Sequence, residues 1–451
     1  MLPVLDIFIV LILTASIFVS SVDLTTFPPA LSQEQESNQQ EDTLTIMLDD
    51  QGDPPRLLKM LFEPALQDLQ DKHPDLDVKL DYRPIPYLDL HSSFLQAMAN
   101  KTSVDIMTVD YIWLGEFVEK GLVTDITNYT KDWGRASDWY QANWDGGSYN
   151  DKIYGVWTVV DARGIWYWKD LLQKAGVDPN LLKTWNGYIE AAKKLNRILR
   201  PEGIEGVHLV GAVHSPDLWY PYLWMLGGEI LQQREGHPTK DVYWFPVFNS
   251  SAGLNALSFI QDQVNAGIKP QKEHFWGKEF LDRKFAVMIE GSWMPTNTQK
   301  FVPIQDFEKR IGFLPMFPVP SKGNQTSTLM GGWEFSIPTT STHKELAWKL
   351  VTLMLEPKIL TPWLVEHRLL PTQVTIGEEE SRFNVSSLYP YYDEMISAIP
   401  FGGSRPSIPE YPLIAHYIEE ALNAVYYGTK DPKEALDDAA TKSAIILGWK
   451  S

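Results

Sequence analysis

Short apolar runs alternate with longer amphipathic stretches along the first third of the chain body. Leu44–Leu48 and Val104–Val109 read as strands, and Val78–Tyr82 alternates as a strand with one exposed face. Apolar positions spaced three and four residues apart predict helices over 57–69 and 88–99. The order strand, helix, strand, helix, strand is typical of an open, mainly parallel α/β sheet with helices on both faces.

The same alternation returns further along the chain, with strands predicted at 165–168 and 207–213 and helices at 185–199 and 254–266. At 451 residues the chain is longer than one compact domain normally is. We therefore expect two similar α/β lobes with a cleft between them.

Ligands of open α/β sheets bind beyond the carboxyl ends of the strands. Asp50 and Asp53 follow the first predicted strand, and Asp110 follows the third. These carboxylates are the first candidates for a binding site. The loop at 49–53 lacks the spaced oxygen ligands and the distal glutamate of a calcium loop, so we predict no metal there.

The N-terminus carries an apolar run, Ile7–Val19, that has the length of a signal-peptide core and is short for a membrane span. Residues 1–32 are predicted to be a signal peptide, cleaved near Ala30–Ser32, or an uncleaved membrane anchor. Residues 33–42 are polar and acidic, without an apolar side chain, and read as a solvated linker. The protein is thus expected outside the cell or at its surface, and five Asn-x-Ser/Thr triplets agree with export.

The net charge and the absence of cysteine exclude or disfavour several classes of function. With 39 Lys and Arg against 58 Asp and Glu the net charge is −19, which disfavours nucleic acid and anionic membrane surfaces as partners. The chain has no cysteine, which rules out disulfides, thiolate nucleophiles and thiol-linked lipids. The sequence also lacks the P-loop, dinucleotide-binding, nucleophile-elbow and zinc-protease motifs, so we predict no cofactor and no enzyme activity.

Tryptophan is abundant instead, with 17 in the chain. An indole face packs on the C–H face of a sugar ring, carboxylates accept from hydroxyl groups, and a guanidinium donates to oxygens. Most of these rings are expected in the core. A combination of Asp, Arg and Trp at strand ends nevertheless favours recognition of a neutral polyol.

Several motifs occur in a fixed order: KIYGVW at 152–157, VD at 160–161, IWYWKDLL at 165–172, FAVMIEGSW at 285–293 and GGWEFSIP at 331–338, followed by Arg405–Pro406. This order resembles the family 1 extracellular solute-binding proteins of ABC importers, closest to their trehalose/maltose-binding branch. The similarity runs from about Thr43 to the C-terminus.

The resemblance implies a two-lobed periplasmic-binding-protein-like fold whose discontinuous lobes are joined by a multi-strand hinge. It places the first lobe at 43–157 and 285–330 and the second at 158–284 and 331–451, with crossings near 155–161, 280–290 and 329–332. By motif, it also implies the following ligand-binding residues: Asp110, Tyr111, Asp161, Trp293, Gly332, Trp333 and Arg405, with a weaker alignment for Asp50 and Asp53.

The function that the resemblance implies is capture of a maltose- or trehalose-like sugar by hinge closure, as a monomer that delivers the sugar to a membrane permease. Two alternatives stay open at this point. One is a secreted glycoside hydrolase, which needs a pair of carboxyl groups across the scissile bond. The other keeps the fold but binds a different polar solute, such as glycerol-phosphate or a peptide.

Overall fold

The structure is a computed structural model that describes residues 42–49, 58–210, 215–240, 242–271, 277–295, 302–321, 325–378 and 390–449. The predicted signal or anchor at 1–32, most of the linker at 33–42, and Asp50 and Asp53 lie outside these residues. Among the described residues, no helix combines the length and apolar character that crossing a membrane requires.

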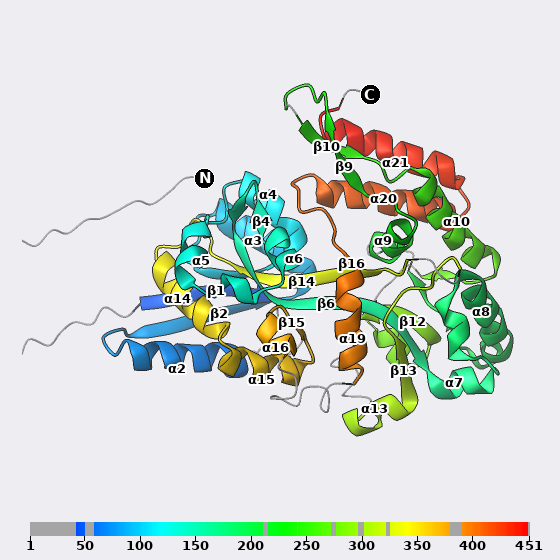
Figure 1. Ribbon diagram of the computed structural model, residues 1–451, viewed down its shortest axis with the longest axis horizontal. Helices are drawn as coiled ribbons and strands as arrows, with labels where there is room; N and C mark the ends of the chain where they lie inside the picture. Colours follow the sequence, from blue (N-terminus) through cyan, green and yellow to red (C-terminus); the bar gives the residue numbers. More distant parts are fainter. Residues whose placement is uncertain are drawn as a thin grey trace, which may run out of the picture. The chain divides into compact units, whose positions relative to one another are not determined.

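A mixed sheet with the strand order β2-β1-β3-β14-β6-β12-β7 organises the body (Figure 1). At one end, β1 (Asp42–Asp49) pairs in parallel with both β2 (Val78–Ile85) and β3 (Ile106–Asp110). Every residue of β3 is buried, which is typical of a parallel strand covered on both faces. This end of the sheet has the predicted parallel βα arrangement.

Two long strands run through the middle of the sheet. β6 (Gly155–Trp168) pairs along its first half with β14 (Thr328–Ser336), in antiparallel orientation, and β14 continues antiparallel onto β3. The sheet is therefore mixed rather than mainly parallel. The strand predicted at 165–168 is only the end of β6.

The second half of β6 belongs to the other end of the sheet. It pairs with β12 (Phe285–Gly291) on one side and with β13 (Ile311–Leu314) on the other, and β12 pairs in parallel with β7 (Glu205–Val207). The predicted crossing at 280–290 is thus a strand of this second end. The strands that pass between the two ends are β6 and β14.

The predicted helices form at or near the expected positions, and the predicted strand at 207–213 is divided into β7 and β8, with 211–214 outside the described residues. The remaining strands are β4 (Ser148–Tyr149), β5 (Lys152–Ile153), β8 (Leu209–Val210), β9 (Leu231–Glu235), β10 (Val242–Pro246), β11 (Pro270–Gln271), β15 (Leu370–Pro371) and β16 (Gly402–Gly403). The α-helices are α2 (Glu63–Lys72), α3 (Tyr87–Ala99), α4 (Leu114–Glu119), α5 (Thr127–Trp133), α6 (Gln141–Gly146), α7 (Lys169–Lys174), α8 (Trp185–Leu199), α9 (Ser215–Met225), α10 (Ser251–Asn265), α11 (Lys278–Leu281), α13 (Ile304–Arg310), α14 (Lys344–Met354), α15 (Pro357–His367), α16 (Val374–Glu378), α19 (Tyr392–Ala398), α20 (Tyr411–Tyr426) and α21 (Pro432–Ile446).

Local sequence signals explain where several helices begin. Thr184 accepts a hydrogen bond from the Gly187 amide at the start of α8, and Asp431 caps α21 in the same way, with Pro432 at its first position. Such caps satisfy amides that have no partner within the helix. They fix the helix starts independently of tertiary contacts.

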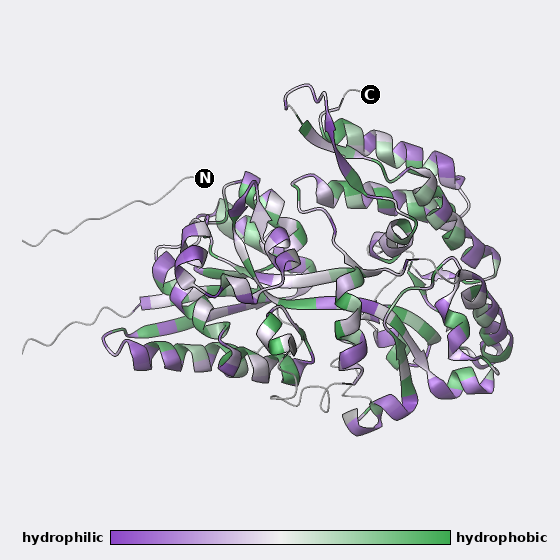
Figure 2. Ribbon diagram, viewed as in Figure 1, coloured by the Kyte–Doolittle hydropathy of each residue, from purple (hydrophilic) through white to green (hydrophobic). Residues whose placement is uncertain are grey.

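Helices cover both ends of the sheet, and Figure 2 shows alternating purple and green segments along them, as expected for helices with one apolar face. α14 packs on α2, at the end of the sheet that holds β1. α20 packs on α21 and α9, beside β10. Residues C-terminal to β14 thus contribute helices to both ends.

Candidate functional site

A group of buried charged residues gathers at the middle of the sheet. Asp110 ends β3, Asp161 and Arg163 lie on β6, Asp217 lies in the first turn of α9, and Arg405 follows β16; we call these five residues the charged junction. Four of them are almost fully buried: Asp110, Arg163, Asp217 and Arg405. Buried charges are costly unless they are paired, so this arrangement needs a specific geometry.

Arg405 is the centre of that geometry. Its Nη1 lies 3.1 Å from Asp217 Oδ2, and its Nη2 lies 3.6 Å from Asp110 Oδ1. Asp110 comes from one end of the sheet, whereas Asp217 comes from a helix that packs on α10 and α20. A single guanidinium therefore connects the β3 end of the sheet to α9.

Tyr111 holds Arg405 in place. The backbone amide of Arg405 donates to Tyr111 Oη at 2.8 Å, and the guanidinium carbon lies 5.2 Å from the centre of the tyrosine ring. The hydroxyl also donates to the Met330 carbonyl on β14. Tyr111 is itself buried, so its observed contacts position Arg405.

Asp110 is oriented by its own partners. Its Oδ1 accepts from the Ile112 amide, and its Oδ2 accepts from the hydroxyl of Tyr87 at 3.0 Å. Burial raises the pKa of Asp110, while the charge of Arg405 and the hydrogen bond from Tyr87 oppose the rise. The local turn after β3 and the start of α3 thus fix this carboxylate.

Asp161 has a different environment. Burial raises its pKa to about 6, and the positive charges of Arg163 and Arg405 act against that rise. Its Oδ1 atom is buried without a hydrogen-bond partner. Gly331 on β14 pairs with Asp161, and a Cβ added to it would lie 2.5 Å from Asp161 Oδ2, so glycine leaves room for the carboxylate.

Two tryptophans border the charged junction. Trp333 pairs with Asp110 in register and contacts Tyr87 and Trp113 edge to face, with ring centres 5.7 and 6.2 Å away. Trp293 lies just after β12, and the guanidinium carbon of Arg163 is 5.6 Å from its ring centre. Both indoles are partly exposed, whereas Trp157, Trp166 and Trp168 are buried in the core.

Most of the residues that the sequence predicted for a site are therefore neighbours in the structure: Asp110, Tyr111, Asp161, Trp293, Trp333 and Arg405. Gly332 lies on the same strand, but a Cβ there would come within 2.3 Å of the Trp157 ring. This glycine accommodates Trp157. Asp50 and Asp53 cannot be placed because they lie outside the described residues.

Sequence reasoning missed three members of this arrangement, namely Tyr87, Arg163 and Asp217. Arg163 lies between the motifs at 160–161 and 165–172 that carry the resemblance, and its spacing of two from Asp161 puts both side chains on one face of β6. That spacing is a signal the sequence contained. Tyr87 and Asp217 meet their partners only through tertiary structure.

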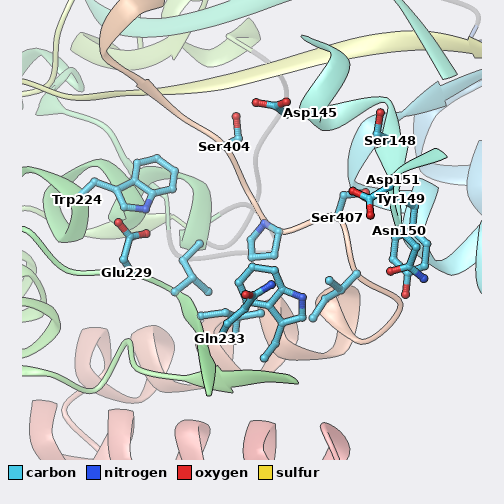
Figure 3. A pocket seen from close by; sticks show the side chains of 15 residues that line it. Asp145, Ser148, Tyr149, Asn150, Asp151, Trp224, Glu229, Gln233, Ser404 and Ser407 are labelled. Carbon is cyan, nitrogen blue, oxygen red and sulfur yellow. The ribbon is translucent and has the colours of Figure 1, made fainter. Parts of the chain in front are cut away.

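A pocket of about 590 Å³ lies beside the charged junction (Figure 3). Trp224 and Glu229 face Asp145 and residues 148–151 across it, and the segment 404–408 lies between the two sides. We call it the acidic pocket, because its described lining includes the carboxylates of Asp145, Asp151 and Glu229 but no Lys or Arg; the other lining residues are Ser148, Tyr149, Asn150, Trp224, Ile230, Leu231, Gln233, Trp244, Ser404, Pro406, Ser407 and Ile408. Burial raises the pKa of Glu229. None of the residues predicted from the sequence lines this pocket, although Ser404 and Pro406 flank Arg405.

Across the residues that the structure describes, no three His, Asp or Glu side chains are grouped closely enough to hold an ion. The carboxylates of the charged junction are instead paired with guanidinium and hydroxyl groups. Such a donor set suits a hydroxylated ligand.

The model of the bacterial extracellular solute-binding proteins matches residues 58–359, which is more than half of the chain. The chain belongs to this family. A curated relative, a binding protein of Brucella abortus, is 22% identical over 378 residues, covering 82% of the chain and 86% of the relative. The arabinooligosaccharide-binding protein of Bacillus subtilis is 24% identical over 301 residues, covering 64% of the chain and 65% of the relative.

Solved structures show the same fold. A solute-binding protein of Thermotoga lettingae bound to α-D-tagatose superposes with a TM-score of 0.76 at 23% identity, covering 90% of the chain and all (100%) of the relative. The maltose-bound MalE3 protein of T. maritima gives a TM-score of 0.72 at 21% identity, with coverage of 90% and 100%. These likenesses confirm the predicted two-lobed α/β fold of a solute-binding protein.

Proposed function

We propose that this solute-binding protein captures a neutral sugar between its lobes and delivers it to an ABC permease. The observation that carries the proposal is the charged junction, in which Arg405 joins Asp110 to Asp217 while Trp293 and Trp333 border the same place. Carboxylates, guanidinium groups and indole faces are the groups that bind hydroxyls and C–H faces of sugars. The three relatives with an identified ligand, named above, bind a tagatose, maltose or arabino-oligosaccharide.

The mechanism is hinge closure. A sugar that contacts Asp110 on one lobe gains the contacts of the other lobe only when the lobes close, so it shifts the equilibrium by that difference in affinity. Arg405 contacts Asp110 on one lobe and Asp217 on the other. The closed form is then the species that a permease recognises, and the energy for transport comes from the permease and its ATPase.

The strand pairs favour a division into lobes that differs from the predicted one. We place 285–295 and 302–321 in the second lobe, because β12 and β13 pair with the second half of β6. We place 344–367 in the first lobe, because α14 packs on α2 and α15 packs on the π-helix Leu58–Phe62. The lobes are then joined by β6, β14 and the chain around 390–403.

A panel of ligands tests the function: maltose, trehalose, α-D-tagatose, arabino-oligosaccharides, glycerol-phosphate and a peptide mixture. We expect one or more sugars to bind with a stoichiometry of one by calorimetry and to raise the unfolding free energy by about 2.7 kcal/mol at a hundred times the Kd. The charged junction is nearly balanced in charge, so glycerol-phosphate should bind more weakly. Absence of binding by every sugar would overturn the proposal.

The hydrolase alternative is tested on the same samples. The family assignment favours a binding protein, so we expect each bound sugar to be recovered intact after incubation with an equimolar amount of protein. Release of smaller sugars at a rate proportional to the protein concentration would favour the hydrolase. Size-exclusion chromatography with light scattering checks the expected monomer.

A further inference from the structure

Arg163 is a second guanidinium beside the proposed sugar site. It lies two residues after Asp161 on β6, and side chains two residues apart share one face of a strand. Its Nη2 lies 3.2 Å from Asp217 Oδ2, and its guanidinium carbon lies 5.6 Å from the ring centre of Trp293. Only 7% of the residue is exposed.

Two polar atoms on this face of β6 are buried without a hydrogen-bond partner, Asp161 Oδ1 and Arg163 Nε. An unsatisfied buried polar atom is expensive, and native proteins contain few of them. Here one atom can only accept and the other can only donate. A hydroxyl group, which both donates and accepts, satisfies either atom, and a pair of neighbouring hydroxyls satisfies both.

The charge of Arg163 is already balanced. Asp217 Oδ2 lies 3.2 Å from Arg163 Nη2 and 3.1 Å from Arg405 Nη1, so this carboxylate pairs with both guanidinium groups. Asp110 pairs with Arg405 as well. Arg163 thus brings a directed N–H to the site with little excess positive charge. This arrangement favours a neutral hydroxyl over a carboxylate or phosphate as the group it binds.

We propose that Arg163 is a specificity-determining residue that donates from Nε to one hydroxyl of a vicinal diol on the bound sugar, while Asp161 Oδ1 accepts from its neighbour. The proposal rests on the proposed sugar-binding function. The ion pair with Asp217 and the nearby indole of Trp293 hold the guanidinium in place, which orients the Nε–H bond. Arg163 selects the ligand, whereas Arg405 connects the lobes.

The variant Arg163→Lys tests this role. Lysine keeps a positive charge near Asp217 but lacks the planar fork that fixes the N–H direction. With the sugar that binds wild type best, we expect the Kd to rise about 10- to 100-fold, as for loss of a hydrogen bond to a charged group. Monodeoxy analogues, each lacking one hydroxyl of that sugar, test the same role. We expect wild type to bind one of these analogues more weakly than the parent sugar, and the variant to bind that analogue and the parent sugar with equal Kd.

Arg283→Lys is the matched control. The guanidinium carbon of Arg283 lies 4.4 Å from the ring centre of Trp168, and its Nη2 lies 2.6 Å from Asp170 Oδ2, so it repeats the Arg–Trp–Asp set away from the site. We expect this variant to bind sugar with the wild-type Kd. Thermal unfolding of Arg163→Lys without sugar shows whether that variant stays folded, so that its Kd reports loss of a ligand contact.

The outcomes separate this inference from the function on which it rests. If wild type binds no sugar, both are overturned. If wild type binds a sugar and Arg163→Lys leaves the Kd and the deoxy discrimination unchanged, this inference alone is overturned. If the variant fails to fold, a crystal structure of wild type with its sugar decides: a ligand hydroxyl within hydrogen-bond distance of Nε supports the inference, and its absence there overturns it.

Discussion

The charged junction and the acidic pocket share the segment 404–408, which supplies Arg405 to the junction and its neighbours to the pocket lining, yet they are built differently. In the junction two guanidinium groups balance carboxylates at distances of 3.1 to 3.6 Å. The acidic pocket offers about 590 Å³ and, in its described lining, three carboxylates with no cation. The charged junction is held by its own ion pairs, whereas the acidic pocket has room for a ligand.

This difference suggests a division of labour in sugar recognition. Preorganised donors and acceptors discriminate between hydroxyl patterns, because a ligand that lacks the matching group leaves buried polar atoms unpaired. An open pocket with indoles at Trp224 and Trp244 discriminates mainly by size. Junction variants should therefore change which sugar binds, and pocket variants should change how long a sugar can be.

The largest effect is expected from Arg405→Ala. Removing this guanidinium leaves Asp110 and Asp217 without their shared partner in a buried place, and breaking a buried pair costs about 3–5 kcal/mol of unfolding free energy. Sugar affinity should fall more than about 100-fold, since the connection between the lobes is lost. Urea unfolding and calorimetry measure the two effects.

Arg83→Ala is the control for that variant. Arg83 pairs with Asp81 at 2.8 Å, but both side chains are 44% exposed. A solvent-exposed pair contributes about 0–1 kcal/mol, so little change in stability and none in sugar affinity is expected. If Arg405→Ala behaves like Arg83→Ala, the charged junction does not join the lobes.

The sequence was sufficient to predict several residues in or beside the charged junction, but it did not predict the acidic pocket. Asp110 could be predicted because a buried strand ends there, and Trp333 because its motif is distinctive. The same reasoning predicted the parallel strands β1, β2 and β3. These features depend on local pattern or on family motifs.

The missed features depend on tertiary contacts. Asp217 meets Arg405 across a sequence separation of 188 residues, and no local pattern marks such a pair. The crossing predicted at 280–290 instead pairs within the second end of the sheet, because an apolar run does not specify its neighbours. The acidic pocket collects residues from three distant segments, so its existence could not be read from any one of them.

A second, smaller effect on the junction side is expected from Asp161→Asn. Burial raises the pKa of Asp161 from 3.8 to about 6. The folded protein therefore ionises this group less readily than the unfolded chain does, so stability falls as pH rises from about 4 to about 6 and stays lowered above that. Two pKa units correspond to about 3 kcal/mol, which is the upper limit of the stability that Asp161→Asn should gain at pH 8.

The same variant should lose sugar affinity, because an amide accepts fewer hydrogen bonds than a carboxylate. We expect the Kd to rise about 10-fold at pH 8. Wild type should likewise bind sugar more weakly as pH falls below about 6, where Asp161 is protonated. Urea unfolding of both proteins at pH 4 and pH 8 checks the stability: a gain that is equal at the two pH values would show that ionisation of Asp161 is not its cause.

The smallest effect is expected on the pocket side, from Trp224→Leu. This indole lines the acidic pocket and packs on Gly403, and leucine keeps an apolar contact there while removing the flat face. Loss of one stacking contact of about 1 kcal/mol corresponds to a Kd about fivefold higher. The loss should appear for tri- and tetrasaccharides and be absent for the disaccharide of the same series, because only longer ligands reach beyond Arg405 into the pocket. Trp133→Leu changes a partly exposed indole that contacts Trp139 and Trp348, neither of which lines the pocket, and should leave both Kd values unchanged. If Trp224→Leu weakens disaccharides and longer sugars equally, the pocket and the charged junction form one undivided site, and the division of labour between them is wrong.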